Sequence, residues 1–202
     1  MDDSALSRSD RLAALKRQII LDAAERVFAR DGLEQTTIRA IAKEAGCTTG
    51  AIYPWFEGKE AIYGELLRAS LTRLLAHLDR QLAQAPASRA ARAAIEGFFA
   101  YYADRQTEFS LGLYLYRGLQ PRGLGKEMDE ALNALLRQAV DRLGAGLAAS
   151  KGWDAARVQI EEMNVFTYLM GLLLLHHTRR VKSLHQRAET LLEHYCQVLE
   201  QS

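Results

Sequence analysis

Side chains suited to contact a polyanion are concentrated between residues 36 and 59 of the 202-residue chain. They comprise hydroxyls, cations, an indole and a glycine, at Thr36, Thr37, Arg39, Thr48, Thr49, Gly50, Tyr53, Trp55 and Lys59. Hydroxyls and amides at a helix N-terminus favour phosphate, and Arg, Lys, Thr and Tyr side chains contact phosphates or base edges. This set predicts a surface that contacts nucleic acid.

Several of these residues also have a plainer interpretation. Thr36 and Thr37 equally suit the N-cap of a helix. Tyr53 can pack between helices and Arg39 can be solvated, while Cys47 is predicted to be a core residue rather than a redox sensor. At the level of the sequence these alternatives stay open.

No combination of side chains in the sequence is typical of an active site. The motifs HExxH and GxSxG are absent, and Gly144-Ala-Gly146 lacks the preceding strand that dinucleotide binding needs. His176 and His177 are adjacent, so on a helix they point about 100° apart and cannot easily share one metal ion. We therefore predict that the protein is not an enzyme and holds no cofactor and no metal.

The elements that position these residues are all predicted to be helices, because apolar residues recur at helical spacing and no alternating strand pattern occurs. The expected helices cover about 12–30, 37–45, 48–53, 59–84, 88–105, 107–117, 126–149, 154–181 and 184–201. Gly32 suits the cap after the first helix, Gly46 ends the second, and the last opens with a capping box over Ser183–Gln186.

Composition gives no electrostatic support for nucleic-acid binding. The net charge is +1, and residues 1–63 carry nine Lys or Arg against ten acids, so the prediction depends on motif and placement. The isolated cysteines Cys47 and Cys196 and the polar N-terminus indicate a cytoplasmic protein. The apolar run over 165–175 is shorter than the roughly 18 residues of a membrane span, so no membrane partner is predicted.

The sequence from Thr37 to Glu60, TIRAIAKEAGCTTGAIYPWFEGKE, together with the pattern over Ile19–Gly32, resembles the TetR family of bacterial regulators. The resemblance covers roughly residues 16–63. It implies a helix-turn-helix at about 37–56 within a DNA-binding domain of residues 1–63, followed by a helical ligand-binding and dimerisation domain of residues 64–202. It also implies a repressor that binds a pseudo-palindromic operator in double-stranded DNA and is released by a small effector.

Three residues depart from the family pattern at the helix that would read DNA. Pro54 lacks a backbone N–H and disfavours helix at Tyr53, so this helix is expected to end early or to tighten. Trp55 stands where the family has His or Tyr and keeps an indole N–H that can reach a phosphate, and Gly58 is a weaker N-cap than Ser or Asn. These departures bear on which operator is bound more than on the fold.

Aromatic side chains gather on the predicted helices 88–105 and 107–117. Together with the resemblance, they indicate a pocket for a largely apolar or aromatic effector. Its lining is predicted to include Phe98, Tyr102, Phe109, Leu113, Phe166, Met170 and His177. Any single one of these residues can instead belong to the core.

Helix 154–181 is apolar almost all round over 165–175, and helix 184–201 carries a broad apolar stripe. We expect one face of each to pack within the domain and the other against a second copy, as the resemblance implies for a homodimer. The expected fold is therefore all-α with two domains. The alternative function is that of a helical small-molecule binding protein without sequence-specific DNA binding.

Overall fold

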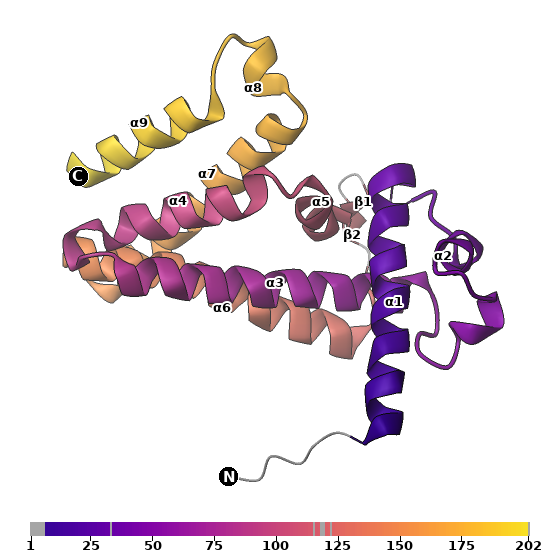
Figure 1. Cartoon of the computed structure of the whole chain (residues 1–202). Helices are drawn as coiled ribbons and strands as arrows, with labels where there is room; N and C mark the ends of the chain where they lie inside the picture. The colour runs from indigo at the N-terminus through magenta and orange to yellow at the C-terminus, as the bar shows by residue number, and fades with distance from the viewer. Residues whose placement is uncertain (1–6, 33, 115, 118–119, 122, 202) are drawn as a thin grey trace. The chain divides into compact units, whose positions relative to one another are not determined.

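In the computed structural model the regular structure is almost entirely helical, which confirms the predicted all-α class (Figure 1). The structure describes residues 7–32, 34–114, 116–117, 120–121 and 123–201, without the side chains of residues 114–122. The α-helices are α1 (Arg8–Asp31), α2 (Ile38–Glu44), α3 (Lys59–Gln84), α4 (Ala90–Ala103), α5 (Gln106–Tyr114), α6 (Lys126–Lys151), α7 (Ala155–His177), α8 (Arg180–Ser183) and α9 (Ala188–Gln201). Two 3-10 helices are η1 (Thr49–Ala51) and η2 (Ala87–Arg89).

A two-stranded antiparallel pair was not predicted from the sequence, in which no strand was found. The strands β1 (Tyr116–Arg117) and β2 (Gln120–Pro121) pair in register, Tyr116 with Pro121 and Arg117 with Gln120. Two residues on each side are too few to produce the alternating pattern by which a strand is predicted from sequence.

The chain divides into two compact units. The first comprises Met1–Leu67 and Ser110–Met128, and the second comprises Arg68–Phe109 and Asp129–Ser202. Helix α3 therefore begins in the first unit and ends in the second. The functional division between residues 63 and 64 stays a prediction, and the inclusion of residues 110–128 in the first unit is a feature that the sequence did not indicate.

Helices α1 and α2 begin and end at capping residues. The Ser7 hydroxyl accepts the backbone N–H of Asp10 at 3.1 Å and the Asp10 carboxylate accepts that of Ser7 at 3.2 Å. This capping box starts α1 at Arg8, four residues before the predicted start. At the other end Gly32 has φ +77°, and the Thr37 hydroxyl caps α2 by accepting the N–H of Ala40 at 3.1 Å.

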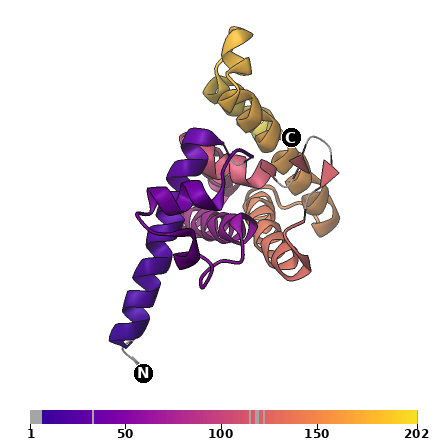
Figure 2. The same cartoon turned by 90° about the vertical axis from the view of Figure 1, so that its right-hand side faces the viewer.

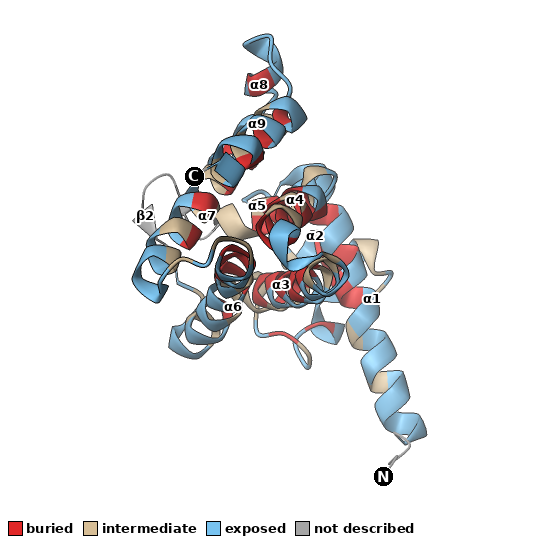
Figure 3. Ribbon diagram, turned by 90° about the vertical axis from the view of Figure 1, so that its left-hand side faces the viewer, coloured by how far each residue is buried: buried red, intermediate tan, exposed pale blue. Residues whose placement is uncertain are grey.

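The core of the first unit is built where α1 crosses α2. The buried side chains are Ala23, Ala24, Val27 and Phe28 of α1, Ile41 and Ala42 of α2, and Ile52 and Phe56 beyond them. The N-terminal turns of α1 run beyond α2 (Figures 1 and 2). They are exposed, as the pale blue of Figure 3 shows. The buried half of α1 thus supports the segment that follows α2.

The core of the second unit lies among α3, α4, α6 and α7, with α4 packed against α7. Its fully buried side chains include Leu74, Leu78, Ile95, Phe98, Leu143, Leu147, Leu169 and Leu173. Among the described helices, α7 is long and apolar enough to cross a membrane by length and composition alone. The prediction of no membrane partner therefore stays a prediction.

The chain after α7 differs from the prediction of two long helices over 154–181 and 184–201. Helix α7 ends at His177, the Thr178 hydroxyl donates back to the Leu174 carbonyl at 2.7 Å, and Arg179 adopts a left-handed conformation with φ +57°. Helix α8 follows for four residues. No glycine or proline lies at these breaks, and the apolar residues continue at helical spacing across them. The sequence therefore predicted longer helices than the structure has.

The predicted capping box at Ser183–Gln186 is wrong. Ser183 belongs to α8, and its hydroxyl donates to the Arg180 carbonyl at 2.9 Å instead of capping α9. Helix α9 begins at Ala188, after His185 has turned the chain with φ +58°.

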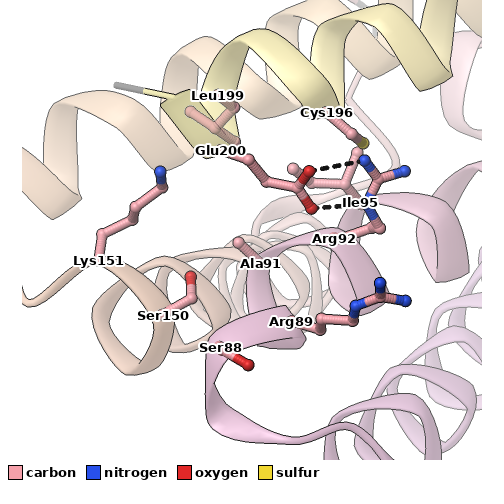
Figure 4. Close-up of a pocket in the computed structure, with 10 residues that line it drawn as sticks. All are labelled: Ser88, Arg89, Ala91, Arg92, Ile95, Ser150, Lys151, Cys196, Leu199 and Glu200. Atoms are coloured by element: carbon pink, nitrogen blue, oxygen red, sulfur yellow. Dashed lines mark hydrogen bonds and ion pairs between the residues drawn. The ribbon is translucent and has the colours of Figure 1, made fainter.

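One arginine of α4 forms ion pairs with α9. The Arg92 guanidinium lies 2.6 Å from a carboxylate oxygen of Glu193 and 2.6 Å from one of Glu200, both on α9, and 3.0 Å from Glu96 on α4. Figure 4 shows the two bonds to Glu200 beside Cys196, which is buried. The side chain of Arg92 is only 15% exposed, so α9 docks through a largely buried cation.

The backbones of α6 and the start of α4 approach closely at Gly146. A Cβ atom on Gly146 would lie 2.7 Å from the Ala90 carbonyl oxygen. Alanine normally stabilises a helix interior relative to glycine by about 0.5–1 kcal/mol. Here we expect Gly146→Ala to lower the free energy of unfolding by about 1–3 kcal/mol, because backbone must move.

The matched control for this substitution is Gly112→Ala. Gly112 lies inside α5 with no heavy atom within 4 Å of its Cβ position, so this change should be neutral or stabilising. Denaturant unfolding of both variants checks the prediction. Equal changes in the free energy of unfolding in the two variants would contradict the close approach of Gly146 to the Ala90 carbonyl.

Candidate functional site

The segment predicted to read DNA is a tight turn rather than a regular α-helix. The N–H of Ala51 donates to the Thr48 carbonyl at 3.0 Å and that of Ile52 to the Thr49 carbonyl at 3.1 Å, forming η1. Beyond it the chain turns through Ile52–Trp55, where the N–H of Trp55 donates to the Ile52 carbonyl at 2.9 Å. The expectation that Pro54 shortens or tightens this helix is confirmed.

Two buried side chains anchor this turn. Ile52 and Phe56 are 0% and 3% exposed, and the Arg17 guanidinium lies over the Phe56 ring at 5.0 Å from its centroid. Arg17 in turn bonds Glu65 at 2.6 Å. The turn is therefore fixed to α1 and α3 within the first unit.

The predicted reading residues lie on the opposite, solvent side of the turn. Thr48, Thr49 and Gly50 are exposed, and the Tyr53 side chain is 56% exposed rather than packed between helices. Arg39 on α2 is also exposed and forms no ion pair within the described residues. Five predicted contact residues are thus exposed to solvent, four of them on the turn and Arg39 on α2, and they present hydroxyl, phenol and guanidinium groups.

Thr36 requires a correction. Its side chain is 1% exposed and its hydroxyl donates to the Gly32 carbonyl at 2.8 Å. A phosphate contact by this side chain is therefore replaced by a structural role, which joins the end of α1 to the start of α2. Thr37 caps α2 and remains exposed, so its proposed phosphate contact stays a prediction.

Lys59 has a structural role that the sequence did not reveal. Its ammonium donates to the carbonyl oxygens of Glu34 at 3.3 Å and Thr36 at 3.1 Å. Two of the three ammonium donors are used in this way, and they fasten the loop before α2 to the first turn of α3. Lys59 therefore sets the position of the α2 N-terminus, and its predicted phosphate contact is left with a single donor.

Two further arginines of the first unit form ion pairs with the same glutamate. Arg26 and Arg30 on α1 contact opposite oxygens of Glu44 on α2 at 2.8 and 3.2 Å. Their hydrogen bonds, that from Arg26 first, hold the pKa of the Glu44 carboxyl below its ordinary value. Two arginines at i,i+4 spacing repel each other, and the glutamate between them lies on another helix, so this pairing was not evident from the sequence.

An apolar cavity of about 450 Å³ lies between α1 and the turn. It is lined by Lys16, Ile19, Ile20, Ala45, Cys47, Ala51, Pro54 and Trp55. Trp55 and Cys47 are half-buried there, so neither is a simple core residue. The predicted indole–phosphate contact of Trp55 stays a prediction.

Five of the predicted effector-site residues form a continuous chain of ring contacts in the second unit. Ring centroids are 6.1 Å apart for Phe166 and Phe98, 5.5 Å for Phe98 and Tyr102, 5.8 Å for Tyr102 and Phe109, and 5.2 Å for Phe109 and His177. We call these five residues the aromatic cluster. Three of them, Phe98, Tyr102 and Phe109, are buried.

The other two predicted lining residues, Met170 and Leu113, are not part of this chain of ring contacts. Met170 is a half-buried residue of α7, and Leu113 belongs to the first unit. The structure therefore does not place Leu113 with the cluster, and its part in an effector site stays a prediction.

Polar groups border the aromatic cluster. The His177 ring nitrogen Nε2 lies 3.0 Å from the Tyr102 carbonyl oxygen, and burial lowers the pKa of His177. Glu108, which the sequence analysis missed, is 9% exposed and accepts a hydrogen bond from the Tyr101 hydroxyl at 2.8 Å. Burial alone would raise the pKa of Glu108, but neighbouring hydroxyls and Arg73, at 3.0 Å, hold it below its ordinary value.

Metal binding finds no support in the described ranges, where no group of three His, Cys, Asp or Glu side chains is arranged to hold an ion.

Residues 20–66 match the model of the family described as bacterial regulatory proteins, tetR family. The chain is 39% identical over 72 residues to the HTH-type transcriptional repressor Rv1474c of Mycobacterium tuberculosis, covering 36% of this chain and 38% of that protein. It is also 39% identical over 75 residues to the HTH-type transcriptional repressor KstR2 of Rhodococcus jostii, covering 37% of each. These alignments thus span little more than a third of the curated relatives.

Solved structures resemble the whole chain. FadR of Bacillus subtilis, a transcriptional regulator solved in complex with stearoyl-CoA, superposes with a TM-score of 0.67 at 21% identity. The match covers 90% of this chain and 96% of that one. At this identity the likeness establishes the fold of both units.

Proposed function

The chain belongs to the TetR family of bacterial regulatory proteins, and on that premise we propose that it is a ligand-responsive transcriptional repressor. Its first unit binds a pseudo-palindromic operator in double-stranded DNA, and a small, largely apolar or aromatic effector releases it. The observation that carries this proposal is the anchored turn of the first unit, where Thr48, Thr49, Gly50 and Tyr53 are exposed together.

The turn is suited to the major groove by shape and chemistry. Threonine hydroxyls contact bases or phosphates, the absence of a side chain at Gly50 permits close approach, and tyrosine binds the phosphate backbone. Arg39, which is free of ion pairs within the described residues, supplies the cation that the overall composition does not. A homodimer would carry two such turns about 34–36 Å apart, one duplex turn, which accounts for a pseudo-palindromic operator.

The proposed homodimer uses an exposed apolar face of α7. Ile160, Met163 and Leu174 are 63%, 43% and 45% exposed and recur at helical spacing, and Thr167 and Gly171 between them are also exposed. On α9, Val198 is 52% exposed. Two such helices from each copy would form a four-helix interface. A protein of this kind is expected to be cytoplasmic, with no membrane partner and no catalytic activity.

We expect Met163→Asp to weaken the dimer at least about tenfold, because a desolvated carboxylate at an apolar interface has no partner. Sedimentation over a range of protein concentrations measures the effect. The control is Ala76→Asp, which introduces the same charge at an exposed position on α3. A wild-type protein that is monomeric at micromolar concentration would contradict the proposed dimer.

Coupling between effector and operator is proposed to run through α3, which begins in the first unit and ends in the second. An effector bound to the second unit would change the direction of α3 and so the spacing of the two turns. Operator affinity falls only if the effector binds the arrangement with mismatched spacing more tightly.

The alternative is a helical small-molecule binding protein that does not read DNA, which the near-neutral charge and Pro54 favour. The salt dependence of duplex binding distinguishes this alternative from the proposed repressor. A DNA-binding protein should lose affinity linearly in log salt, with a slope of about −0.9 per neutralised phosphate. Replacing Arg39 by Ala should reduce this slope by about 1 if Arg39 contacts a phosphate.

The control for that measurement is Arg180→Gln, which removes an exposed cation from the second unit. The slope should be unchanged in this variant. No binding of a duplex at low salt would favour the alternative over the repressor.

A further inference from the structure

The densest run of cations in the chain joins α7 to α9. The sequence over 176–187 is HHTRRVKSLHQR, which contains four Lys or Arg, three His and no acid. It forms the end of α7, all of α8 and the turn before α9, which lie together at one end of the second unit (Figure 1). The function proposed above gives the lysine and arginine side chains of this segment no role.

A cavity of about 610 Å³ lies against this segment, a volume typical of a site for a small molecule. Its polar lining includes Gln106, His176, His177, Arg179, Lys182 and Arg187. One acid, Glu189, also lines it, and this carboxylate lies 3.6 Å from Arg187. Arg179 and Lys182 form no ion pair among the described residues, so the cavity carries an excess of positive charge.

The backbone that presents these cations is held in an unusual conformation. Arg179 and His185 bracket α8, and both have positive φ, at +57° and +58°, without being glycine. Such strain persists where the surrounding structure determines it, and it is found preferentially at ligand-binding sites. The cationic side chains that line the cavity are exposed, whereas its apolar lining residues Val181 and Ala188 are buried.

Two imidazoles separate the cationic cavity from aromatic side chains. His177 contacts the Phe109 ring at 5.2 Å between centroids, and His176 contacts the Phe99 ring at 5.8 Å. Each Nε2 lies near a backbone carbonyl at the end of α4, that of Tyr102 at 3.0 Å and that of Ala103 at 3.2 Å. The charged wall and the aromatic wall are therefore neighbours in one unit and are fixed to the same helix.

We infer that this cavity binds the anionic group of the effector, so that the ligand is an amphipathic acid. Its carboxylate, sulfonate or phosphate would lie among Arg179, Lys182 and Arg187, and its apolar body would extend along the imidazoles toward the aromatic cluster. Calling this ligand an effector rests on the proposed function, but the binding of an amphipathic acid to the cavity does not require that the protein bind DNA.

A matched pair of fluorescent probes tests the inference on the full-length protein in the absence of DNA. The anionic probe is 8-anilinonaphthalene-1-sulfonate, and N-phenyl-1-naphthylamine has the same ring system without the sulfonate. Wild-type protein should bind the sulfonate more tightly than the neutral probe. In the double variant Lys182→Gln/Arg187→Gln, the dissociation constant of the sulfonate should rise about tenfold because two charged hydrogen-bond donors are lost, while that of the neutral probe should stay the same.

Arg180→Gln is the control, because Arg180 belongs to the same short helix and does not line the cavity. It should leave both dissociation constants unchanged. The inference is overturned by a sulfonate affinity that the double variant leaves unchanged, or by an equal loss for both probes. An equal loss in the Arg180 control also overturns it. If the protein passes this test but does not bind DNA, the inferred anion site stands and the proposed repressor function is wrong.

Discussion

Replacing Thr49 by Asp should lower the affinity for the preferred DNA fragment by about 10- to 100-fold. Thr49 lies in η1 with an exposed side chain, and a carboxylate there would replace a neutral hydroxyl by a charge that the phosphate backbone repels. Ile52 and Phe56, which anchor the turn, are untouched by the change. The free energy of unfolding should therefore stay within about 0.5 kcal/mol of the wild-type value.

Fluorescence anisotropy with a labelled fragment selected by the wild-type protein measures this effect. Gln84→Glu is the charge-matched control, because it also adds one negative charge, at an exposed residue at the end of α3 in the second unit. If both variants bind DNA equally well, η1 does not face the duplex, and the proposed interface is wrong.

Replacing Arg92 by Met should detach α9. The substitution removes the shared partner of Glu96, Glu193 and Glu200 and leaves three carboxylates near one another. Their side chains are 40–49% exposed and become solvated. This limits the cost, and we expect backbone amides of α9 to exchange about 30- to 100-fold faster, equivalent to roughly 2–3 kcal/mol.

The matched control for Arg92 is Arg89→Met, because Arg89 lines the same cavity of about 350 Å³ but forms no ion pair within the described residues (Figure 4). Hydrogen exchange in α9 should be unchanged in that variant. Equal exchange rates in the two variants would show that apolar packing of α9 is sufficient to hold it on α4.

The same contact predicts a pH dependence. Hydrogen bonds from Arg92 hold the pKa of the Glu193 and Glu200 carboxyls below the ordinary value of 4.5. A carboxyl of this kind stabilises the folded state above its ordinary pKa and loses that contribution as the pH falls through the lowered value. Docking of α9 should therefore weaken below about pH 4.5 in the wild type, and much less so in Arg92→Met.

Local signals in the sequence predicted the first unit well. The apolar stripe of α1, the cap at Thr37, the glycine after α1 and the turn at Pro54 all act within a few residues. They determine where helices begin and end whatever the rest of the chain does. The shortening of the reading helix was therefore predictable from one proline.

The roles that were missed depend on contacts between distant residues. Lys59 looks like a phosphate ligand by type, yet its hydrogen bonds go to the carbonyls of Glu34 and Thr36, which only the folded chain brings near. Thr36 is an exception, because its hydroxyl bonds the Gly32 carbonyl only four residues earlier. The buried Glu108 and the clamp of Arg92 on α9 depend in the same way on partners from other helices. The breaks on either side of α8 occur at Arg179 and His185, where no residue type signals a turn.

Selection of genomic DNA by the purified protein tests the central claim most directly. Sheared genomic DNA from the source organism is incubated with the protein at low salt, and the bound fragments are sequenced. We predict selective enrichment of fragments that share a pseudo-palindromic sequence, and loss of that enrichment in Thr49→Asp. No enrichment of any fragment at low salt would contradict the proposal that this chain is an operator-binding repressor.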